Sequence, residues 1–326
     1  MSDNDKGSMH LSSDQLDDNI VLPFYAEIAG VNGRVVRLGS TIDAILKQHD
    51  YPEAVSKILG EAIVLTFMMG TTLKFEGRLI LQAQTKGAVE LLVVQFSTPG
   101  KVRGYAKFNQ DKIAAISGEG KSAYQDLMHD GHLAITIDQG EDMERYQGIV
   151  ALGGDSLSDA AQQYFDQSEQ LPSFVRLAVA RHFTAGEGDQ SGTWMWRAGG
   201  LMVQDLTSEG GREVAAERDI EVVDQELVDG DGWNRARTLA ATVEDHELLD
   251  PMLGPEELVY RLFHEERVRG FDKKPLINEC SCSRDHIQGV IKQFGDEEIE
   301  GMIEDGKITV TCEFCSSKYL FEREEF

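Results

Sequence analysis

The sequence Cys280-Ser281-Cys282 and, after residues 283–311, Cys312-Glu313-Phe314-Cys315 decides how the C-terminal part of this chain folds. These are the four cysteines of the 326-residue chain, and they form two close pairs with none left over. Two thiol pairs brought together across a loop suit tetrahedral Zn²⁺, whose bonds to sulfur are about 2.3 Å long. Four thiolates without a histidine leave no open position for water, which is typical of a structural site. We therefore predict one Zn²⁺ per chain, bound by Cys280, Cys282, Cys312 and Cys315.

The length of the C-terminal segment supports a metal site. We predict a small domain at residues 269–326, and a segment of this size usually needs a metal, disulfides or a partner to fold. In comparable small zinc domains the metal supplies about 10 kcal/mol or more of folding free energy. His286, which follows Cys282 closely, is an alternative ligand, whereas His264 fits a helix surface or an interface better.

The residues before the cysteines predict an α+β fold. Apolar residues recur at helical spacing in residues 52–69, and residues 41–48 form a second candidate helix. Residues 21–38 read as two strands that turn at Val31-Asn32-Gly33, because Asn-Gly favours a hairpin. A short helix is expected after Gly199-Gly200. Further strands, separated by glycines, are predicted at residues 79–84, 89–96, 102–108, 132–138, 146–152, 174–183 and 193–197.

These elements predict four regions along the chain. Residues 1–20 are polar and read as disordered, and residues 21–207 form one mixed α+β domain with helices and a largely antiparallel sheet. Residues 208–257 then hold 15 acidic residues, four arginines and no lysine, with scattered valines and leucines. This composition is too polar for a stable core and too apolar for a plain spacer, so we predict a metastable, partly helical linker at residues 208–268. The alternative is a solvated two-helix connector with no role of its own.

Charge and hydropathy limit the classes of partner. The net charge of −26 repels phosphate backbones, so we expect no nucleic-acid partner. The longest apolar run, residues 62–69, is far shorter than the roughly 20 residues of a membrane span, and the N-terminus lacks the order of a signal peptide. We expect a cytoplasmic protein that does not enter membranes, in which clustered cysteines indicate metal or redox chemistry.

Several longer runs resemble one family, the heat-shock protein 33 family of redox-regulated holdase chaperones. The resemblance covers most of the chain from about residue 21 to residue 321. In the body it is carried by Tyr164 with Ser168-Glu169-Gln170-Leu171-Pro172, and by Ala198-Gly199-Gly200-Leu201-Met202-Val203-Gln204. Towards the C-terminus it is carried by Leu262-Phe263-His264-Glu265-Glu266, by Cys280-Ser281-Cys282-Ser283-Arg284, by the run from Gly306 to Cys315, and by Tyr319-Leu320-Phe321.

The resemblance implies a mechanism. The reduced, zinc-bound form is a poor chaperone. Oxidants, helped by mild unfolding, convert Cys280–Cys282 and Cys312–Cys315 into disulfides and expel zinc. The linker then unfolds, and the oxidised protein forms a homodimer that holds unfolded or misfolded client proteins without ATP. The resemblance implies no catalytic residues, so we expect a chaperone and not an enzyme.

Two departures and two alternatives remain. Asp285-His286 stands where the family usually has a glutamate and a basic residue, and the middle segment is longer and more acidic than usual. Neither departure touches a predicted ligand, although both can change how easily the protein is activated. The alternatives are a zinc-ribbon binding module, which the acidic C-terminal segment disfavours, and a thiol oxidoreductase, whose usual strand–helix context is missing around Cys312.

Overall fold

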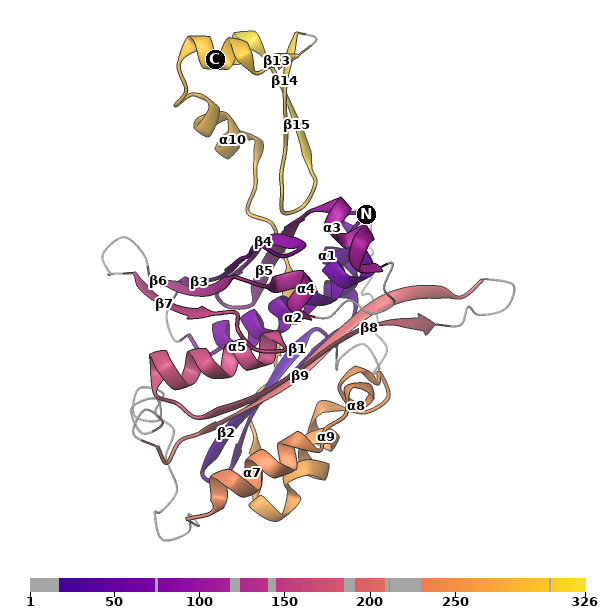
Figure 1. The fold of residues 1–326 in the computed structure, drawn as a ribbon, viewed down its shortest axis with the longest axis vertical. Helices are drawn as coiled ribbons and strands as arrows, with labels where there is room; N and C mark the ends of the chain where they lie inside the picture. The colour runs from indigo at the N-terminus through magenta and orange to yellow at the C-terminus, as the bar shows by residue number, and fades with distance from the viewer. Residues whose placement is uncertain are drawn as a thin grey trace, which may run out of the picture.

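The computed structural model describes residues 18–73, 76–117, 124–139, 145–184, 191–208, 211, 230–304 and 306–326. These residues form a mixed α+β structure with three β-sheets, which confirms the predicted fold class (Figure 1). The predicted disordered start falls mainly on residues 1–17, outside the described residues, and the first strand begins at Ile20. Within the described ranges, no helix combines the length and the apolar character needed to cross a bilayer.

The first sheet, sheet A, is built from strands at both ends of the chain. Its order is β10-β1-β2-β9-β8, all antiparallel, and β11 also pairs with β1. Strands near the C-terminal cysteines are therefore attached to the N-terminal strand. The bounds are β1 Ile20–Ala26, β2 Val31–Leu38, β8 Ser173–Thr184, β9 Thr193–Asp205, β10 Val268–Gly270 and β11 Lys274–Pro275.

The second sheet, sheet B, follows the order β12-β5-β4-β3-β6-β7. Its strands are antiparallel except for β12, which runs parallel to β5. The bounds are β3 Arg78–Gln84, β4 Val89–Ser97, β5 Lys101–Phe108, β6 His132–Asp138, β7 Tyr146–Ala151 and β12 Ile277–Asn278.

Helix α2, Glu53–Gly70, lies between the two sheets and contacts strands of both. It is buried on nearly all sides, as its apolar sequence requires. The main hydrophobic core therefore lies around α2, between sheet A and sheet B. Smaller helices complete this part of the protein: α1 Ser40–Lys47, α3 Gln110–Ser117, α4 Tyr124–Met128, and α5 Leu157–Tyr164, which continues as a π-helical turn over Phe165–Glu169.

The opposite face of sheet A is covered by three helices, here called the linker helices (Figure 1). They are α7 Gly232–Ala241, α8 Asp245–Leu249 and α9 Pro255–Phe263, and a 3-10 turn follows at His264–Glu266. The last of these helices lies near the end of the predicted linker. Much of the rest of the predicted linker, residues 212–229, lies outside the described residues. The linker helices and sheet A share a second core, to which the helices contribute Ala236, Ala240, Leu248, Leu258, Val259 and Phe263.

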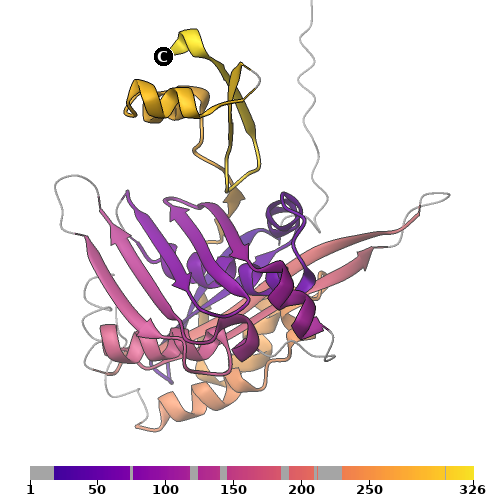
Figure 2. The same cartoon turned by 45° about the horizontal axis from the view of Figure 1, so that its top comes forward.

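The last part of the chain forms a separate small unit, here called the C-terminal module, residues 279–326. Figure 2 shows most of it projecting beyond the two larger sheets, to which a narrow connection joins it. Its own core is small and contains four buried residues: Ile291, Ile299, Ile308 and Phe321. The elements are α10 Arg284–Ile291, α11 Asp296–Gly301, and a sheet of β13 Ile303–Glu304, β14 Lys307–Thr311 and β15 Lys318–Glu322.

Two local predictions were wrong, both at glycines. Asn32-Gly33 does not form the turn but lies inside β2, where the Phe24 ring packs so closely that a Cβ on Gly33 would lie 2.0 Å from it. The turn comes earlier and ends at Gly30, whose φ is +64°. Gly199 and Gly200 do not start a helix but remain in β9. A Cβ on Gly199 would lie 2.4 Å from the Leu248 carbonyl oxygen of α8, so glycine here permits close packing of a linker helix on the sheet.

Candidate functional site

The four cysteines come from two places in the C-terminal module. Cys280 and Cys282 precede α10, whose N-cap Ser283 accepts a hydrogen bond from the His286 backbone N–H. Cys312 and Cys315 lie in the turn between β14 and β15. Backbone hydrogen bonds close this turn: the Cys312 N–H donates to the Ser317 carbonyl at 2.9 Å, and the Ser316 N–H donates to the Cys312 carbonyl at 2.8 Å. The fold of the module thus brings the two pairs face to face.

The sulfur atoms are close enough to share one ion. All four lie within 4.8 Å of one another. The Sγ atoms of Cys280 and Cys312 are 3.7 Å apart, and those of Cys282 and Cys315 are 3.3 Å apart. Four sulfurs around a zinc ion with bonds of about 2.3 Å would be separated by about 3.8 Å. The arrangement therefore fits a tetrahedral thiolate site.

The titration of the thiols also fits a bound cation. Burial raises the pKa of Cys282 to about 12, and neighbouring thiols add to this although the Tyr319 hydroxyl lowers it. Burial likewise raises the pKa of Cys312. Burial acts in the same direction on Cys315, but hydrogen bonds with Ser317, Cys282 and Cys312 outweigh it and bring the pKa down to about 7. Four thiolates cannot all be charged in this space without a positive ion, and a dication meets that requirement.

Polar groups around the sulfurs come from both the module and the sheets. The Tyr319 hydroxyl lies 3.1 Å from the Cys282 sulfur, and the Ser317 hydroxyl lies 3.3 Å from the Cys315 sulfur. Arg103, from β5 of sheet B, lies 3.8 Å from the Cys280 sulfur. Such outer partners orient ligands. Sequence reasoning missed Arg103 because nothing in its local pattern links it to cysteines so far along the chain.

The two histidines considered from the sequence lie outside the sulfur cluster. His286 is exposed on α10 and is not part of the cluster of potential ligands. His264 is exposed at the end of α9, with its ring 5.6 Å from the ring of Tyr260. Histidine, cysteine, aspartate and glutamate side chains can hold a metal where three or more of them lie close together. Over the described ranges, the four cysteines are the one such group.

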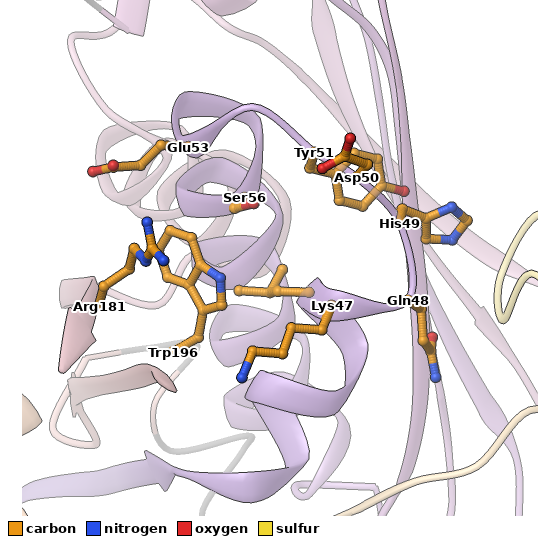
Figure 3. A pocket seen from close by; sticks show the side chains of 10 residues that line it. Lys47, Gln48, His49, Asp50, Tyr51, Glu53, Ser56, Arg181 and Trp196 are labelled. Atoms are coloured by element: carbon orange, nitrogen blue, oxygen red, sulfur yellow. The ribbon is translucent and has the colours of Figure 1, made fainter. Parts of the chain in front are cut away.

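A separate open pocket of about 400 Å³ lies beside α1 and the start of α2 (Figure 3). Its charged lining is largely paired: Lys47 bonds Asp43 at 2.8 Å, and Lys57 bonds the lining residue Glu53 at 2.8 Å. Arg181 lies over the Trp196 ring at 5.9 Å. This pocket therefore lacks the convergent polar groups that characterise a ligand site.

Comparisons with known proteins agree with this arrangement. The family model described as "Hsp33 protein" matches residues 19–322. A protein named "33 kDa chaperonin" from Caulobacter vibrioides is 43% identical, covering 94% of this chain and 95% of the relative. A protein of the same name from Pseudomonas aeruginosa is 36% identical, covering 92% of this chain and 90% of the relative.

The fold is also known from a crystal structure. The 33 kDa chaperonin of Thermotoga maritima superposes with a TM-score of 0.71 over 94% of this chain and 96% of that one, at 19% sequence identity. The comparison thus covers nearly the whole of both chains. The family match spans nearly the whole sequence, and the relatives are named for a chaperone function. This chain therefore belongs to the Hsp33 family.

Proposed function

We propose that this protein is a redox-regulated, ATP-independent holdase, inactive when reduced and zinc-bound. One observation carries the proposal. The short strands β10, β11 and β12 join the linker helices, which cover an apolar face of sheet A, to the four-cysteine site. β12 ends at Asn278, close before Cys280, and β10 begins close after α9. A change at the sulfurs is therefore transmitted to the segment that anchors the linker helices.

The proposed chemical step uses all four ligands. In the reduced state one Zn²⁺ would be held by Cys280, Cys282, Cys312 and Cys315. Its positive charge would offset the negative charges of the thiolates. Each cysteine pair then gives two electrons to one peroxide molecule, whose O–O bond breaks, and forms one S–S bond, Cys280–Cys282 or Cys312–Cys315. Because the zinc-bound thiolates carry no protons, four protons from the solvent complete the conversion of two peroxides into four waters. Disulfide sulfurs carry no charge to hold a dication, and the ion leaves. Each new disulfide closes only a tiny loop and restrains neither pair against the other.

Loss of the ion removes most of what holds the module together, because its core contains four buried residues. We propose that the linker helices then leave sheet A and that oxidised protomers form a homodimer. The exposed face contains Leu22, Phe24, Val35, Leu201 and Val203, which are buried in the reduced protein. Apolar surface of this kind binds unfolded or misfolded client proteins, and the acidic linker keeps the complexes soluble.

The same proposal assigns regions and location. Residues 21–207 act as the chaperone domain, residues 208–268 as the linker and residues 269–326 as the zinc-binding switch, in a cytoplasmic protein. Two other functions have less support. Cys312 and Cys315 lie in a β-hairpin turn, not at the start of a helix as in thioredoxin-like enzymes. Residues 271–326 hold seven basic and thirteen acidic residues, which disfavours a nucleic-acid-binding zinc ribbon.

The deciding experiment follows zinc and client aggregation together. Reduced protein is treated with peroxide at mildly raised temperature, zinc is measured with a colorimetric chelator, and a heat-unfolded client is added. We expect about one zinc per chain to leave as aggregation is suppressed. Zinc release without suppression would mean that the site is structural only and would overturn the holdase assignment.

A further inference from the structure

The turn that carries Cys312 and Cys315 rests against the large sheets through its middle residue, Phe314. The Arg103 guanidinium lies over the Phe314 ring at 4.1 Å, and the Tyr105 ring meets it edge-on at 4.9 Å. Both side chains come from β5. The Nε2 atom of His49 lies 3.3 Å from the Phe314 carbonyl oxygen, so the backbone of the turn is contacted as well as its side chain.

His49 contacts the turn at a second point. Its Nδ1 atom lies 3.1 Å from the Ser316 hydroxyl, and Phe314 and Ser316 are the neighbours of the ligand Cys315 on either side. The imidazole stacks on the Tyr51 ring at 4.9 Å. Figure 3 shows the His49 ring pointing away from Arg181 and Trp196. The histidine therefore belongs to the contact with the module.

The surface that receives the turn is held in place by the large sheets. The Gln95 side chain on β4 accepts two hydrogen bonds from Arg103, at 2.8 and 3.2 Å. The Tyr51 hydroxyl accepts a hydrogen bond from the Ala106 N–H of β5 at 3.0 Å. Side chains fixed in this way lose little freedom on contact, so the surface is preorganised. We call His49, Tyr51, Arg103 and Tyr105 the docking cradle.

The other cysteine pair is attached next to the cradle. β12 pairs with the first residues of β5, and Lys101 forms an ion pair with Glu279 at 2.5 Å. Arg103 itself reaches both pairs, since it lies 3.8 Å from the Cys280 sulfur and over Phe314. The two halves of the metal site are therefore docked side by side on one strand.

We infer that the docking cradle recognises the metal-bound form of the Cys312–Cys315 turn, so that docking of the module and retention of the metal stabilise each other. This inference rests on the proposed function. Phe314 and Ser316 contact the cradle while Cys315, between them, lies 3.3 Å from the Cys282 sulfur, so the docked turn is the turn that presents its ligand. Coupling between two equilibria is reciprocal: if the metal favours docking, docking favours the metal by the same factor. The chaperone domain thus takes part in setting how readily the metal is lost.

The test measures metal loss without using chaperone activity. Reduced wild-type protein and the variants Arg103→Gln and Phe314→Leu are mixed with a zinc chelator in the absence of oxidant, and the rate of zinc loss is followed. Phe314→Leu keeps an apolar side chain and removes the aromatic face. We expect one zinc per chain at the start in all three proteins and loss about threefold to tenfold faster in both variants. The double variant should be no faster than the faster single one, because both substitutions break the same contact.

Arg78→Gln is the matched control, since Arg78 is an exposed arginine on β3 of the same sheet, away from the module. It should lose zinc at the wild-type rate. Hydrogen exchange gives a second readout: Arg103→Gln and zinc-free wild type should both show faster exchange at residues 312–318 and 101–106. If the Arg103 and Phe314 variants lost zinc at the wild-type rate and showed wild-type hydrogen exchange, the inference would be overturned and the proposed function would stand. Wild-type protein without bound zinc would overturn both.

Discussion

The Arg197 side chain donates a hydrogen bond from Nε to the Leu249 carbonyl oxygen at 2.8 Å, joining β9 of sheet A to the C-terminal end of α8. Asp18 holds the same guanidinium through two short contacts of 2.6 and 2.7 Å. The buried Arg37 of β2 donates to the next carbonyl, that of Asp250. The end of α8 is thus held by two charge-assisted hydrogen bonds on a largely buried ionic cluster, which makes it a strong attachment point for the linker helices.

Arg197→Met should loosen this attachment. Methionine keeps an apolar stem but cannot donate to the Leu249 carbonyl, and it leaves Asp18 without its nearest cation. We expect a loss of about 2–4 kcal/mol in the stability of the packed linker helices. The reduced, zinc-bound variant should then suppress client aggregation partially without oxidant. Hydrogen exchange at residues 245–253 and an aggregation assay would measure both effects.

Arg176→Met is the control for that experiment. Arg176 also bonds α8, through Asp245 at 2.7 Å, but both side chains are exposed. Exposed pairs contribute less than about 1 kcal/mol, so this variant should stay close to wild type. Equal effects of the two substitutions would show that the buried cluster has no special part in holding the linker helices.

Removing zinc from the reduced protein should unfold the C-terminal module and leave the core around α2 folded. The module has few buried residues of its own, whereas the core around α2 is complete without it. After chelation, amides of β14 and β15 should lose their protection from hydrogen exchange, and amides of β3 and β4 should keep it. Persistent protection of β14 in protein shown to be free of zinc would contradict a metal-dependent fold.

The ligand assignment has its own test. Cys280→Ser should abolish tight zinc binding, because an alcohol is a poor replacement for a thiolate in this site. His286→Ala should retain one zinc per chain, since His286 is exposed and lies outside the sulfur cluster. Zinc content after dialysis against a weak chelator separates these outcomes, and loss of zinc from the histidine variant would reopen the choice of ligands.

Stability should fall as the pH rises towards neutrality because of Glu61 on α2. Burial, together with the nearby charge of Asp245, raises the pKa of Glu61 from 4.5 to about 7, although Lys57 acts in the opposite direction. The folded protein therefore binds an additional proton between these values. The contribution of this proton to the free energy of unfolding is at most about 3 kcal/mol. It is complete below pH 4.5 and is lost as the pH approaches 7.

Glu61→Gln should remove this part of the pH dependence, since an amide does not titrate. Urea unfolding at pH 5 and at pH 7.5 would compare the variant with wild type. Glu53→Gln on the same helix is the control: its hydrogen bond with Lys57 lowers the pKa of Glu53, so it is ionised across this window. If Glu61→Gln lost as much stability between pH 5 and pH 7.5 as the wild type, the pH dependence would come from other groups.

The amino-acid sequence predicted the elements whose signals are local. The apolar periodicity of α2 predicted a buried helix, and the spacing of the four cysteines predicted that they come together in a cluster that could hold a metal. The structure has both the helix and the cluster. Contacts between distant segments could not be predicted in this way. The pairing of β10 and β11 with β1 depends on segments hundreds of residues apart, and so does the contact of Arg103 with Phe314.

The two errors at glycines share one physical cause. Asn32-Gly33 has the composition of a turn, and Gly199-Gly200 can mark the boundary of a helix. In both places the missing side chain instead makes room for a neighbour: the Phe24 ring at Gly33, and α8 and α2 at Gly199 and Gly200. The local sequence indicates which backbone conformations a glycine can adopt. It does not indicate which distant residue packs against the position of the missing side chain.

The space at Gly199 and Gly200 has a wider consequence. On one side of β9 the Leu248 carbonyl lies where a Cβ of Gly199 would be, and on the other side the Met68 side chain of α2 lies 2.6 Å from the Cβ position of Gly200. At these two residues only the main chain of β9 separates the core around α2 from the linker helices. A methyl group at Gly199 would act as a wedge under α8 while every thiol stayed reduced. Under the proposed function, the inactivity of the reduced protein would thus depend on the missing Cβ of Gly199 as well as on the metal ion at the cysteines.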